Sequence, residues 1–263
     1  FSGRVMNMVT LATRQPGGFR DEQMALFDAC MPALATVVEL DQMRRTGRTL
    51  LATYVGPRTA ERVWEGTIRR GQGERVYAIV YICDLRGFTE LAAGQPLEET
   101  IALLNAYFDA MGGAVERHGG EILKFMGDAL LAIFPCDRNT VHDCRTGAEA
   151  LAAAEEGLAA LAALSADRQA SGLPALRAGA ALSVGDVLYG NIGVDDRLDF
   201  TVIGPAVNLA ARMQALCSTL GSDLLLSAEV CRRLHRPTRS RGRHRLKGVS
   251  EAVEVFEPLP AEG

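Results

Sequence analysis

The N-terminal part of the chain has the hydrophobic spacing of amphipathic helices. Between residues 19 and 50, apolar side chains recur every three or four positions, which places them on one face of a helix. The residues of this stripe are Met24, Phe27, Met31, Leu34 and Val38. Pro32 lacks a backbone N–H, so we expect it to kink or divide this helix. A second helical connector is predicted over residues 50–71, ending at Gly71.

From residue 76 the pattern becomes that of strands and a hairpin. Residues 76–83, VYAIVYIC, form a nearly continuous apolar run, which predicts a central strand buried on both faces. Pro96 then opens a predicted helix that ends before Gly119. Its apolar stripe comprises Ile101, Leu104, Phe108, Met111 and Val115. Two apolar runs, 122–125 and 129–134, flank a Met-Gly-Asp turn and predict a β-hairpin.

The second half of the chain continues the alternation of helices and strands. Alanine-rich residues 140–170 predict a long helix. The other expected elements are strands at 176–184, 187–192, 200–203 and 224–226, a helix at 205–216, and a strand-like tail at 245–257. The first two of these strands are predicted to join at Gly185-Asp186. The core order is therefore βαββαβ with additions, which predicts an α+β, ferredoxin-like fold.

A polar, glycine-containing stretch at residues 69–75 separates the two patterns, and we expect the domain boundary there. This predicts a helical signalling or connector segment at 1–73 and a larger domain at 74–263. The stretch at 17–40, GGFRDEQMALFDACMPALATVVEL, resembles the closing helix of a GAF-type sensor domain. A plain dimerising or packing helix is the open alternative. Because the chain begins with phenylalanine, we expect a fragment of a longer protein with a sensor domain upstream, and an upstream membrane domain is the open alternative.

Composition and charge are those of an ordinary folded, soluble protein. Hydrophobic residues make up 48% and charged residues 23% of the 263 positions. The net charge of −4 gives no reason to expect nucleic acid binding, because the one basic cluster, at 232–247, is local. Six dispersed cysteines without a C-x-x-C pair predict reduced thiols and a cytoplasmic location. No apolar run approaches the roughly 20 residues of a membrane-spanning helix.

Two carboxylates are expected to meet at one end of the predicted sheet. Asp84 ends the first core strand, and Asp128 lies at the hairpin tip, so adjacent central strands would bring them together. Two like charges side by side are unfavourable unless a cation neutralises them. Hard oxygen ligands favour Mg²⁺ or Mn²⁺, which indicates metal-assisted phosphoryl or nucleotidyl transfer. For the hairpin alone, a solvated turn with Lys124 on the surface is the alternative.

Three segments together resemble the catalytic domain of class III nucleotidyl cyclases. They are CDLRGFT at 83–89, KFMGD at 124–128 and DFTVIGPAVNLAAR at 199–212. The resemblance covers about residues 74–258 and rests on several motifs in the order that the family has them. It implies that Asp84 and Asp128 hold two divalent cations, Mg²⁺ or Mn²⁺, with the backbone carbonyl of Leu85 as a further ligand.

The same resemblance assigns the contacts to the nucleotide. Lys124 and Thr201 occupy the base-selecting positions, where a lysine can donate to adenine N1 and a threonine hydroxyl can accept from the N6 amine. Guanylyl cyclases of the family carry glutamate and cysteine there, so this pair favours ATP. Threonine in place of aspartate is similar to the subgroup that often responds to bicarbonate. Asn208 and Arg212, four apart on one helix, would orient the ribose and stabilise charge on the α-phosphate.

Phosphate contacts are expected from the loop at residues 86–89. There the backbone N–H groups of Phe88 and Thr89 lead toward a helix N-terminus, which attracts anions. Lys247 stands near the position of the triphosphate-binding lysine of the family, and a plain surface lysine is the open alternative.

The resemblance implies an adenylyl cyclase that converts ATP to cyclic AMP and pyrophosphate. All of the family's site residues occur in this one chain, which implies a head-to-tail homodimer with two equivalent shared sites. The N-terminal helices would pass a signal from the sensor. Guanylyl cyclase activity is the alternative within the family. From other classes, the alternatives are a catalytically silent dimerising signalling module and a palm-type polymerase, the latter disfavoured because no basic nucleic-acid channel is evident.

Overall fold

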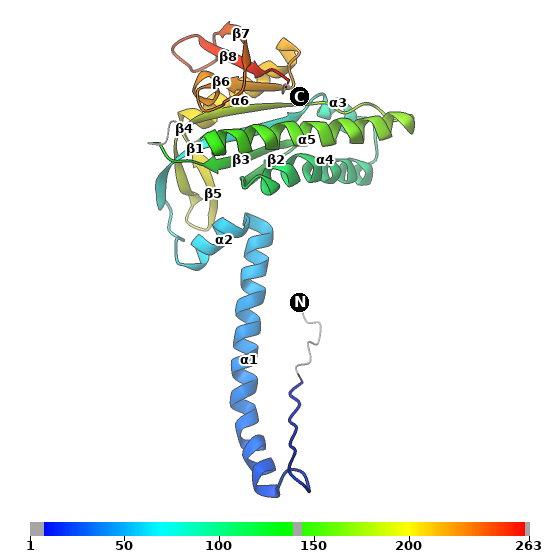
Figure 1. Cartoon of the computed structure of the whole chain (residues 1–263), viewed down its shortest axis with the longest axis vertical. Helices are drawn as coiled ribbons and strands as arrows, with labels where there is room; N and C mark the ends of the chain where they lie inside the picture. Colours follow the sequence, from blue (N-terminus) through cyan, green and yellow to red (C-terminus); the bar gives the residue numbers. More distant parts are fainter. Residues whose placement is uncertain (1–7, 139–143, 261–263) are drawn as a thin grey trace. The chain divides into compact units, whose positions relative to one another are not determined.

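One long helix, α1 (Asp21–Val55), makes up most of the N-terminal part of the chain (Figure 1). Pro32 was expected to kink or divide this helix. It lies inside α1, which continues through it undivided. The hydroxyl of Thr36, one turn further on, donates to the carbonyl oxygen of Pro32 at 3.0 Å. No residue of α1 is buried, and in its apolar stripe the ring of Phe27 packs edge-on against Phe19, with centroids 5.3 Å apart.

Helix α1 also bears on the expected absence of a membrane-spanning segment. It contains an 18-residue stretch with a mean hydropathy of 1.3, which by length and composition alone is enough to cross a membrane. The expectation that no stretch approaches this length is therefore wrong. Core helices of soluble proteins and signal sequences pass the same criterion, so a position in a membrane does not follow.

The computed structural model describes residues 8–138 and 144–260. By internal packing, the chain divides into two units, Phe1–Leu50 and Leu51–Gly263. Every strand of the described residues lies in the second unit. The functional residues expected from the sequence lie there as well, so the second unit is the one that positions the site.

A short helix, α2 (Pro57–Trp64), precedes the sheet. The sequence predicted one helical connector over residues 50–71, and both of its ends are wrong. Residues 50–55 continue α1, and Gly56 separates them from α2. The helix ends at Trp64, and Gly66 follows with a φ of 100°, a left-handed backbone conformation that side chains with a Cβ rarely adopt. The remaining residues before the sheet form turns, which lets the chain change direction into the first strand.

Strand β1 (Gly73–Leu85) is central in the eight-stranded sheet of the described residues, and it pairs antiparallel with β3 on one side and β4 on the other. The order across the sheet is β2-β3-β1-β4-β6-β8-β7, with β5 paired to β4. The other strands are β2 (Glu121–Met126), β3 (Ala129–Pro135), β4 (Ala178–Val194), β5 (Arg197–Ile203), β6 (Leu224–Ser227), β7 (Thr238–His244) and β8 (Val253–Pro258). The first four strands with their helices form the predicted βαββαβ core, so the α+β, ferredoxin-like expectation is confirmed.

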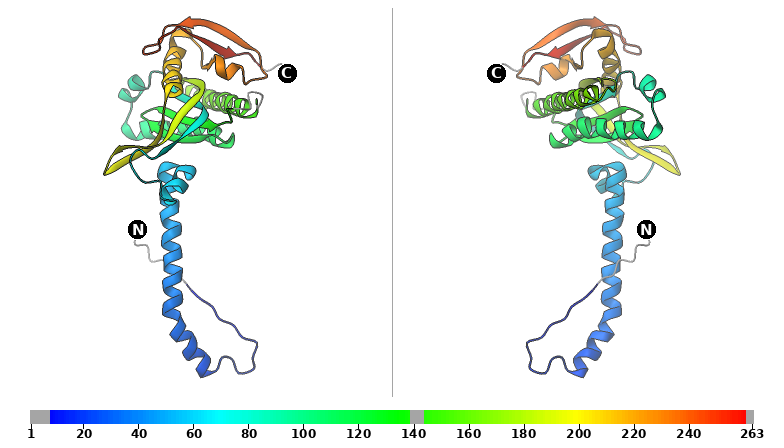
Figure 2. Two further views of the ribbon diagram at one scale, coloured as in Figure 1. Left: turned by 90° about the vertical axis from the view of Figure 1, so that its left-hand side faces the viewer. Right: turned by 90° about the vertical axis from the view of Figure 1, so that its right-hand side faces the viewer.

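Helices cover both faces of the sheet, and Figure 2 shows α4 and α5 together on one of them. The helices are α3 (Phe88–Ala93), α4 (Leu97–Arg117), α5 (Cys144–Ala170), α6 (Pro205–Leu220) and α7 (Ala228–Cys231). Tyr81 and Cys83 of β1 pack with α4 and α5, whereas Val80 and Ile82 pack with α6 on the other face. This alternation is that of a central strand buried on both sides. The predicted start of α5 at Thr140 lies outside the described residues.

The buried stripe of α4 is rotated from the predicted one. Its buried residues are Thr100, Leu103, Tyr107, Met111, Gly112, Ala114 and Val115. Of the predicted stripe, Met111 and Val115 are buried, Leu104 and Phe108 are partly buried, and Ile101 is 51% exposed. Tyr107 is an amphipathic residue that the hydrophobic pattern passed over, and it is fully buried beneath β1.

Strand β4 departs from the prediction because it runs without a break. Gly185 and Asp186 were expected to separate two strands, but they pair in register with Ala78 and Tyr77 of β1. Long-range pairing overrides the low strand propensity of these two residues. A Cβ on Gly185 would lie 3.1 Å from the Cβ of Ala206, so glycine allows α6 to pack closely here.

The C-terminal strands also differ from the prediction. Strand β7 has the sequence TRSRGRH and was not predicted, because it lacks an apolar alternation. It is an edge strand, where charged side chains are common because they oppose pairing with other chains. The strand-like tail expected at 245–257 is a strand only at Val253–Pro258.

Candidate functional site

A pair of carboxylates lies where the central strands end. Cys83 of β1 pairs with Leu130 of β3, so Asp84 stands beside the hairpin tip that carries Asp128. The two carboxyl groups are close enough for Asp128 to shift the pKa of Asp84, so the structure brings them together as expected. Asp84 Oδ1 is buried and has no hydrogen-bond partner among the described residues. Burial, followed by the hydrogen bond and the charge of Asp128, raises the pKa of Asp84 from 3.8 to about 7.

This raised pKa has a consequence for stability. The folded chain holds a proton on Asp84 more tightly than the unfolded chain, so this group lowers the free energy of unfolding as pH rises through 3.8 to about 7. We expect Asp128→Asn to raise the melting temperature of the metal-free chain at about pH 8 and to change it much less at about pH 4.5. Thermal unfolding in a chelator measures this, with the exposed Asp109→Asn as control. An equal effect at both pH values would contradict the assigned repulsion.

The residues at this pair fit a divalent cation. Two carboxylates with an unpartnered buried oxygen offer hard ligands and gain by neutralisation. Within residues 8–138 and 144–260, no group of three or more His, Cys, Asp or Glu side chains converges on one point. Further ligands would therefore come from main-chain carbonyls, such as that of buried Leu85, and from the substrate.

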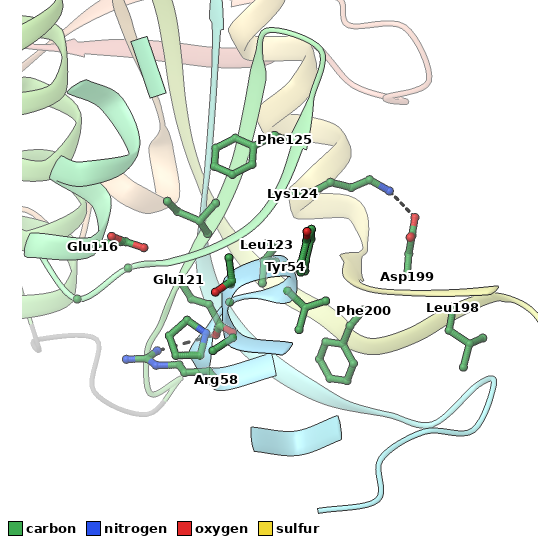
Figure 3. A pocket seen from close by; sticks show the side chains of 18 residues that line it. Tyr54, Arg58, Glu116, Glu121, Leu123, Lys124, Phe125, Leu198, Asp199 and Phe200 are labelled. Atoms are coloured by element: carbon green, nitrogen blue, oxygen red, sulfur yellow. Dashed lines mark hydrogen bonds and ion pairs between the residues drawn. The ribbon is translucent and has the colours of Figure 1, made fainter. Parts of the chain in front are cut away.

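Lys124 is held by a partner that sequence reasoning missed. Its Nζ lies 2.5 Å from Asp199 Oδ2, and this ion pair lowers the pKa of Asp199 (Figure 3). Asp199 and Thr201 are two apart on β5 and therefore share a face of that strand. The ion pair thus brings the Lys124 ammonium to the face of β5 that carries Thr201. Asp199 is the first residue of the third motif. Its spacing of two residues from Thr201 is the signal that could have identified Asp199 as a partner of Lys124.

A cavity of about 700 Å³ adjoins Lys124. It is lined by residues 52–58 of the connector, 119–125 around β2, 198–200 of β5, and Glu116. Figure 3 shows Lys124 directed to Asp199 at one side and Arg58 directed to Glu121 at another. The cavity therefore places the end of the connector beside the strand that carries Lys124.

A buried carboxylate fastens this connector to the sheet. Glu121 is only 6% exposed and accepts a hydrogen bond from the hydroxyl of Tyr189 on β4 at 2.5 Å. The hydroxyl of Thr59 on α2 lies 3.0 Å from the same tyrosine oxygen. The ring of Phe200 packs edge-on against Tyr189 with centroids 4.7 Å apart. Contacts therefore run from α2 through Tyr189 to the residue next to Thr201, and the sequence pattern gave no sign of them.

Asn208 and Arg212 are exposed on one face of α6, as predicted from their spacing. The helix buries Ala206, Ala210 and Met213 against the sheet, which turns the other face outward. In the part of the chain that the structure describes, Arg212 forms no ion pair, and no ion pair joins Lys124 to Asp84 or Asp128. Among the described residues, no ion pair thus links the carboxylate pair to the outward face of α6.

The three expected phosphate contacts lie in different settings. Phe88 opens α3 and its half-buried ring packs against the core, whereas Thr89 is exposed. The N–H of Arg86 donates to the carbonyl oxygen of Arg177 at 2.8 Å, so this group of the 86–89 loop already has a partner. Lys247 is exposed and has no carboxylate partner among the described residues.

Comparison with known proteins gives consistent matches for the second unit. The family model for the adenylate and guanylate cyclase catalytic domain matches residues 74–256. An adenylate cyclase of Anabaena cylindrica is 35% identical over 187 residues, which are 68% of this chain and 36% of that protein. The chain spans 32% to 40% of the length of the first curated relatives that it matches.

Solved structures agree with this match. The crystal structure of the adenylyl cyclase CyaB from P. aeruginosa has a TM-score of 0.65 and 28% identity, and the similarity covers 73% of this chain and 97% of that one. The guanylyl cyclase Cya2 has a TM-score of 0.60 and 29% identity, covering 71% and 93%. Proteins named for either nucleotide therefore share this fold.

Proposed function

The chain belongs to the adenylate and guanylate cyclase catalytic domain family, and from this premise we propose that it is an adenylyl cyclase converting ATP to cyclic AMP and pyrophosphate. The observation that carries the choice of ATP is the Lys124–Asp199 ion pair, which holds a permanent donor on the face of β5 that carries Thr201. A lysine can donate to adenine N1 but cannot accept the N1–H of guanine.

The carboxylate pair supplies the metal half of the proposed site. Asp84, Asp128 and the carbonyl of Leu85 would hold two divalent cations, Mg²⁺ or Mn²⁺. Bound there, the cations supply activation of the ribose 3′-hydroxyl and neutralisation of the triphosphate. The buried, unpartnered Oδ1 of Asp84 supports this assignment, because an ionised carboxylate in such a position needs a counter-charge.

The nucleotide half of the proposed site uses α6, β2 and β5. Lys124 and Thr201 bind the adenine edge, Asn208 orients the ribose, and the guanidinium of Arg212 stabilises the charge that develops on the α-phosphate. The remaining proposed contacts to the triphosphate are Phe88, Thr89 and Lys247. Most of the catalytic effect then comes from positioning and charge stabilisation.

We further propose that each site is shared by two copies of the chain in a head-to-tail homodimer. The carboxylate pair would face Asn208 and Arg212 of the other copy, since no ion pair links them among the described residues of one chain. The hairpin tip supports an interface, because Phe125 and Met126 are 51% and 44% exposed there. Asp128 would then hold metal in one site while Lys124 reads the base in the other.

Mixing two inactive variants tests this arrangement. We expect Asp84→Ala chains and Arg212→Ala chains to be inactive alone and to regain about a quarter of wild-type activity when mixed equally, because half of randomly paired dimers carry one intact site. Production of cyclic AMP from ATP with Mn²⁺ is the measurement. A mixture of Asp84→Ala with Asp128→Ala is the matched control, since both changes fall in the same half-site. Recovery in the control, or none in the test mixture, would contradict a shared site.

Two alternative functions, a guanylyl cyclase and a catalytically silent signalling module, can each be tested. The match to a guanylyl cyclase structure favours assaying GTP alongside ATP, and cyclic GMP as the main product would replace the present proposal. A silent signalling module would give no cyclic nucleotide from either substrate. The threonine-type, bicarbonate-responsive assignment is tested in the same assay with and without bicarbonate. A cytoplasmic catalytic domain regulated by an upstream sensor through the connector completes the proposal.

A further inference from the structure

The side chain of Arg86 contacts residues at the end of α6, although Arg86 itself lies beside the carboxylate pair. It follows Asp84 by two residues, yet its side chain, 18% exposed, turns to a distant part of the chain. One guanidinium nitrogen, Nη2, lies 2.6 Å from the carbonyl oxygen of Ser222, 2.9 Å from Asp223 Oδ1 and 3.5 Å from the carbonyl oxygen of Cys217. These groups are 131 to 137 positions away in the sequence.

The groups that Arg86 contacts lie in the last turn of α6, at Cys217, and in the segment just after the helix, at Ser222 and Asp223. That helix ends at Leu220, and Gly221 closes it in the left-handed conformation with a φ of 64°. The last carbonyls of a helix lack partners within it and carry partial negative charge. The half-buried guanidinium of Arg86 adds charge-assisted contacts there, because it donates to the carbonyl oxygen of Ser222 and pairs with Asp223. It also lies near the carbonyl oxygen of Cys217, which already accepts the N–H of Ser222. These contacts join the end of α6 to the segment that leaves β1.

We propose that Arg86 is a positioning residue that clamps the carboxylate segment, residues 84–89, to the far end of α6, the helix that carries Asn208 and Arg212. This inference rests on the proposed function. If each site is shared, the carboxylates and the α6 of one chain serve different sites. The clamp would then fix the position of the carboxylates, which bind metal in one site, relative to α6, which binds ribose and phosphate in the other site.

Arg177 provides a matched control. It also pairs with Asp223 Oδ1, at 3.1 Å, but its side chain is 60% exposed. It makes no side-chain hydrogen bond to α6 in the described chain. We expect Arg86→Gln to lower kcat about 10- to 100-fold through misalignment, and Arg177→Gln to change kcat less than about twofold. Arg86→Lys keeps the positive charge but lacks the several N–H donors of the guanidinium, so its kcat should lie between those of Arg86→Gln and Arg177→Gln.

Variant mixtures separate a clamp from a local effect. In the mixture of Asp84→Ala with Arg212→Ala chains, the intact site takes its carboxylates from the latter and its α6 from the former. Arg86→Gln is added to one chain or to the other. The clamp predicts a loss of recovered activity in both placements, whereas a loss in one placement only, or in neither, overturns it.

A second readout does not depend on activity. Hydrogen exchange of the α6 amides in the metal-free chain should be faster in Arg86→Gln than in the wild type and unchanged in Arg177→Gln. Unchanged exchange in Arg86→Gln overturns the clamp. If the starting mixture recovers no activity, the shared site fails while the exchange result still decides the role of Arg86. If circular dichroism shows that Arg86→Gln does not fold, Arg86→Lys is carried through both experiments with the same expected pattern.

Discussion

An Asp84→Asn chain is expected to be at least as stable as the wild type without metal and to have lost nearly all cyclase activity. The change keeps the shape of the side chain and removes one charge from the repelling pair, so the metal-free fold does not suffer. It also removes an ionised ligand, and several kcal/mol of transition-state stabilisation by metal correspond to a loss in kcat of about 10³-fold or more.

The combination of stability and inactivity is what identifies a functional carboxylate. Structural carboxylates usually destabilise the fold when they are replaced, because their partners are left unpaired. Thermal unfolding with and without Mn²⁺ gives an independent measurement: the metal should raise the melting temperature of the wild type and not that of Asp84→Asn. Asp109→Asn, on the exposed face of α4, should behave as wild type in both assays. An Asp84→Asn chain that still gains stability from Mn²⁺ would contradict the assigned ligand.

The meeting of Asp84 and Asp128 could be predicted from the sequence because it depends on local features. Each lies at the end of an apolar run, and a βαββαβ order places those runs side by side. The continuous strand β4 could not be predicted in the same way. Gly185 and Asp186 have poor strand propensity, and only pairing with β1 holds them extended.

The contacts that position the candidate site were beyond sequence reasoning for a related reason. Lys124 and Asp199 are 75 positions apart, and Glu121 and Tyr189 are 68 apart. Such pairs follow from the order of the strands in the sheet and from where β5 folds back along β4, neither of which has a local pattern. The motifs therefore predict which residues act on the nucleotide, and these roles stay predictions, whereas the structure shows which residues contact them.

Exchanging the base-selecting residues is expected to reverse the nucleotide preference. Lys124→Glu with Thr201→Cys would present an acceptor to the N1–H of guanine and a weak donor to its O6. Each mismatched buried polar group costs about 1–3 kcal/mol, so the two changes should shift the ratio of kcat/KM for ATP and GTP by roughly 10²-fold or more toward GTP. Lys124→Glu should account for most of this, because a threonine hydroxyl can rotate to donate to O6 by itself.

The ion pair with Asp199 decides how this experiment is designed. Lys124→Glu alone would place a second carboxylate beside Asp199, where the lysine ammonium now lies 2.5 Å from its oxygen. Like charges at that distance would push the new side chain away from the base. The exchange should therefore work better with Asp199→Asn added, and that dependence is itself a prediction of the ion pair. Lys124→Met is the control, because it removes the donor without adding an acceptor and should weaken ATP turnover with no gain for GTP. If the combined variant still prefers ATP, then Lys124 and Thr201 do not contact the base, and the choice of ATP loses the observation on which it rests.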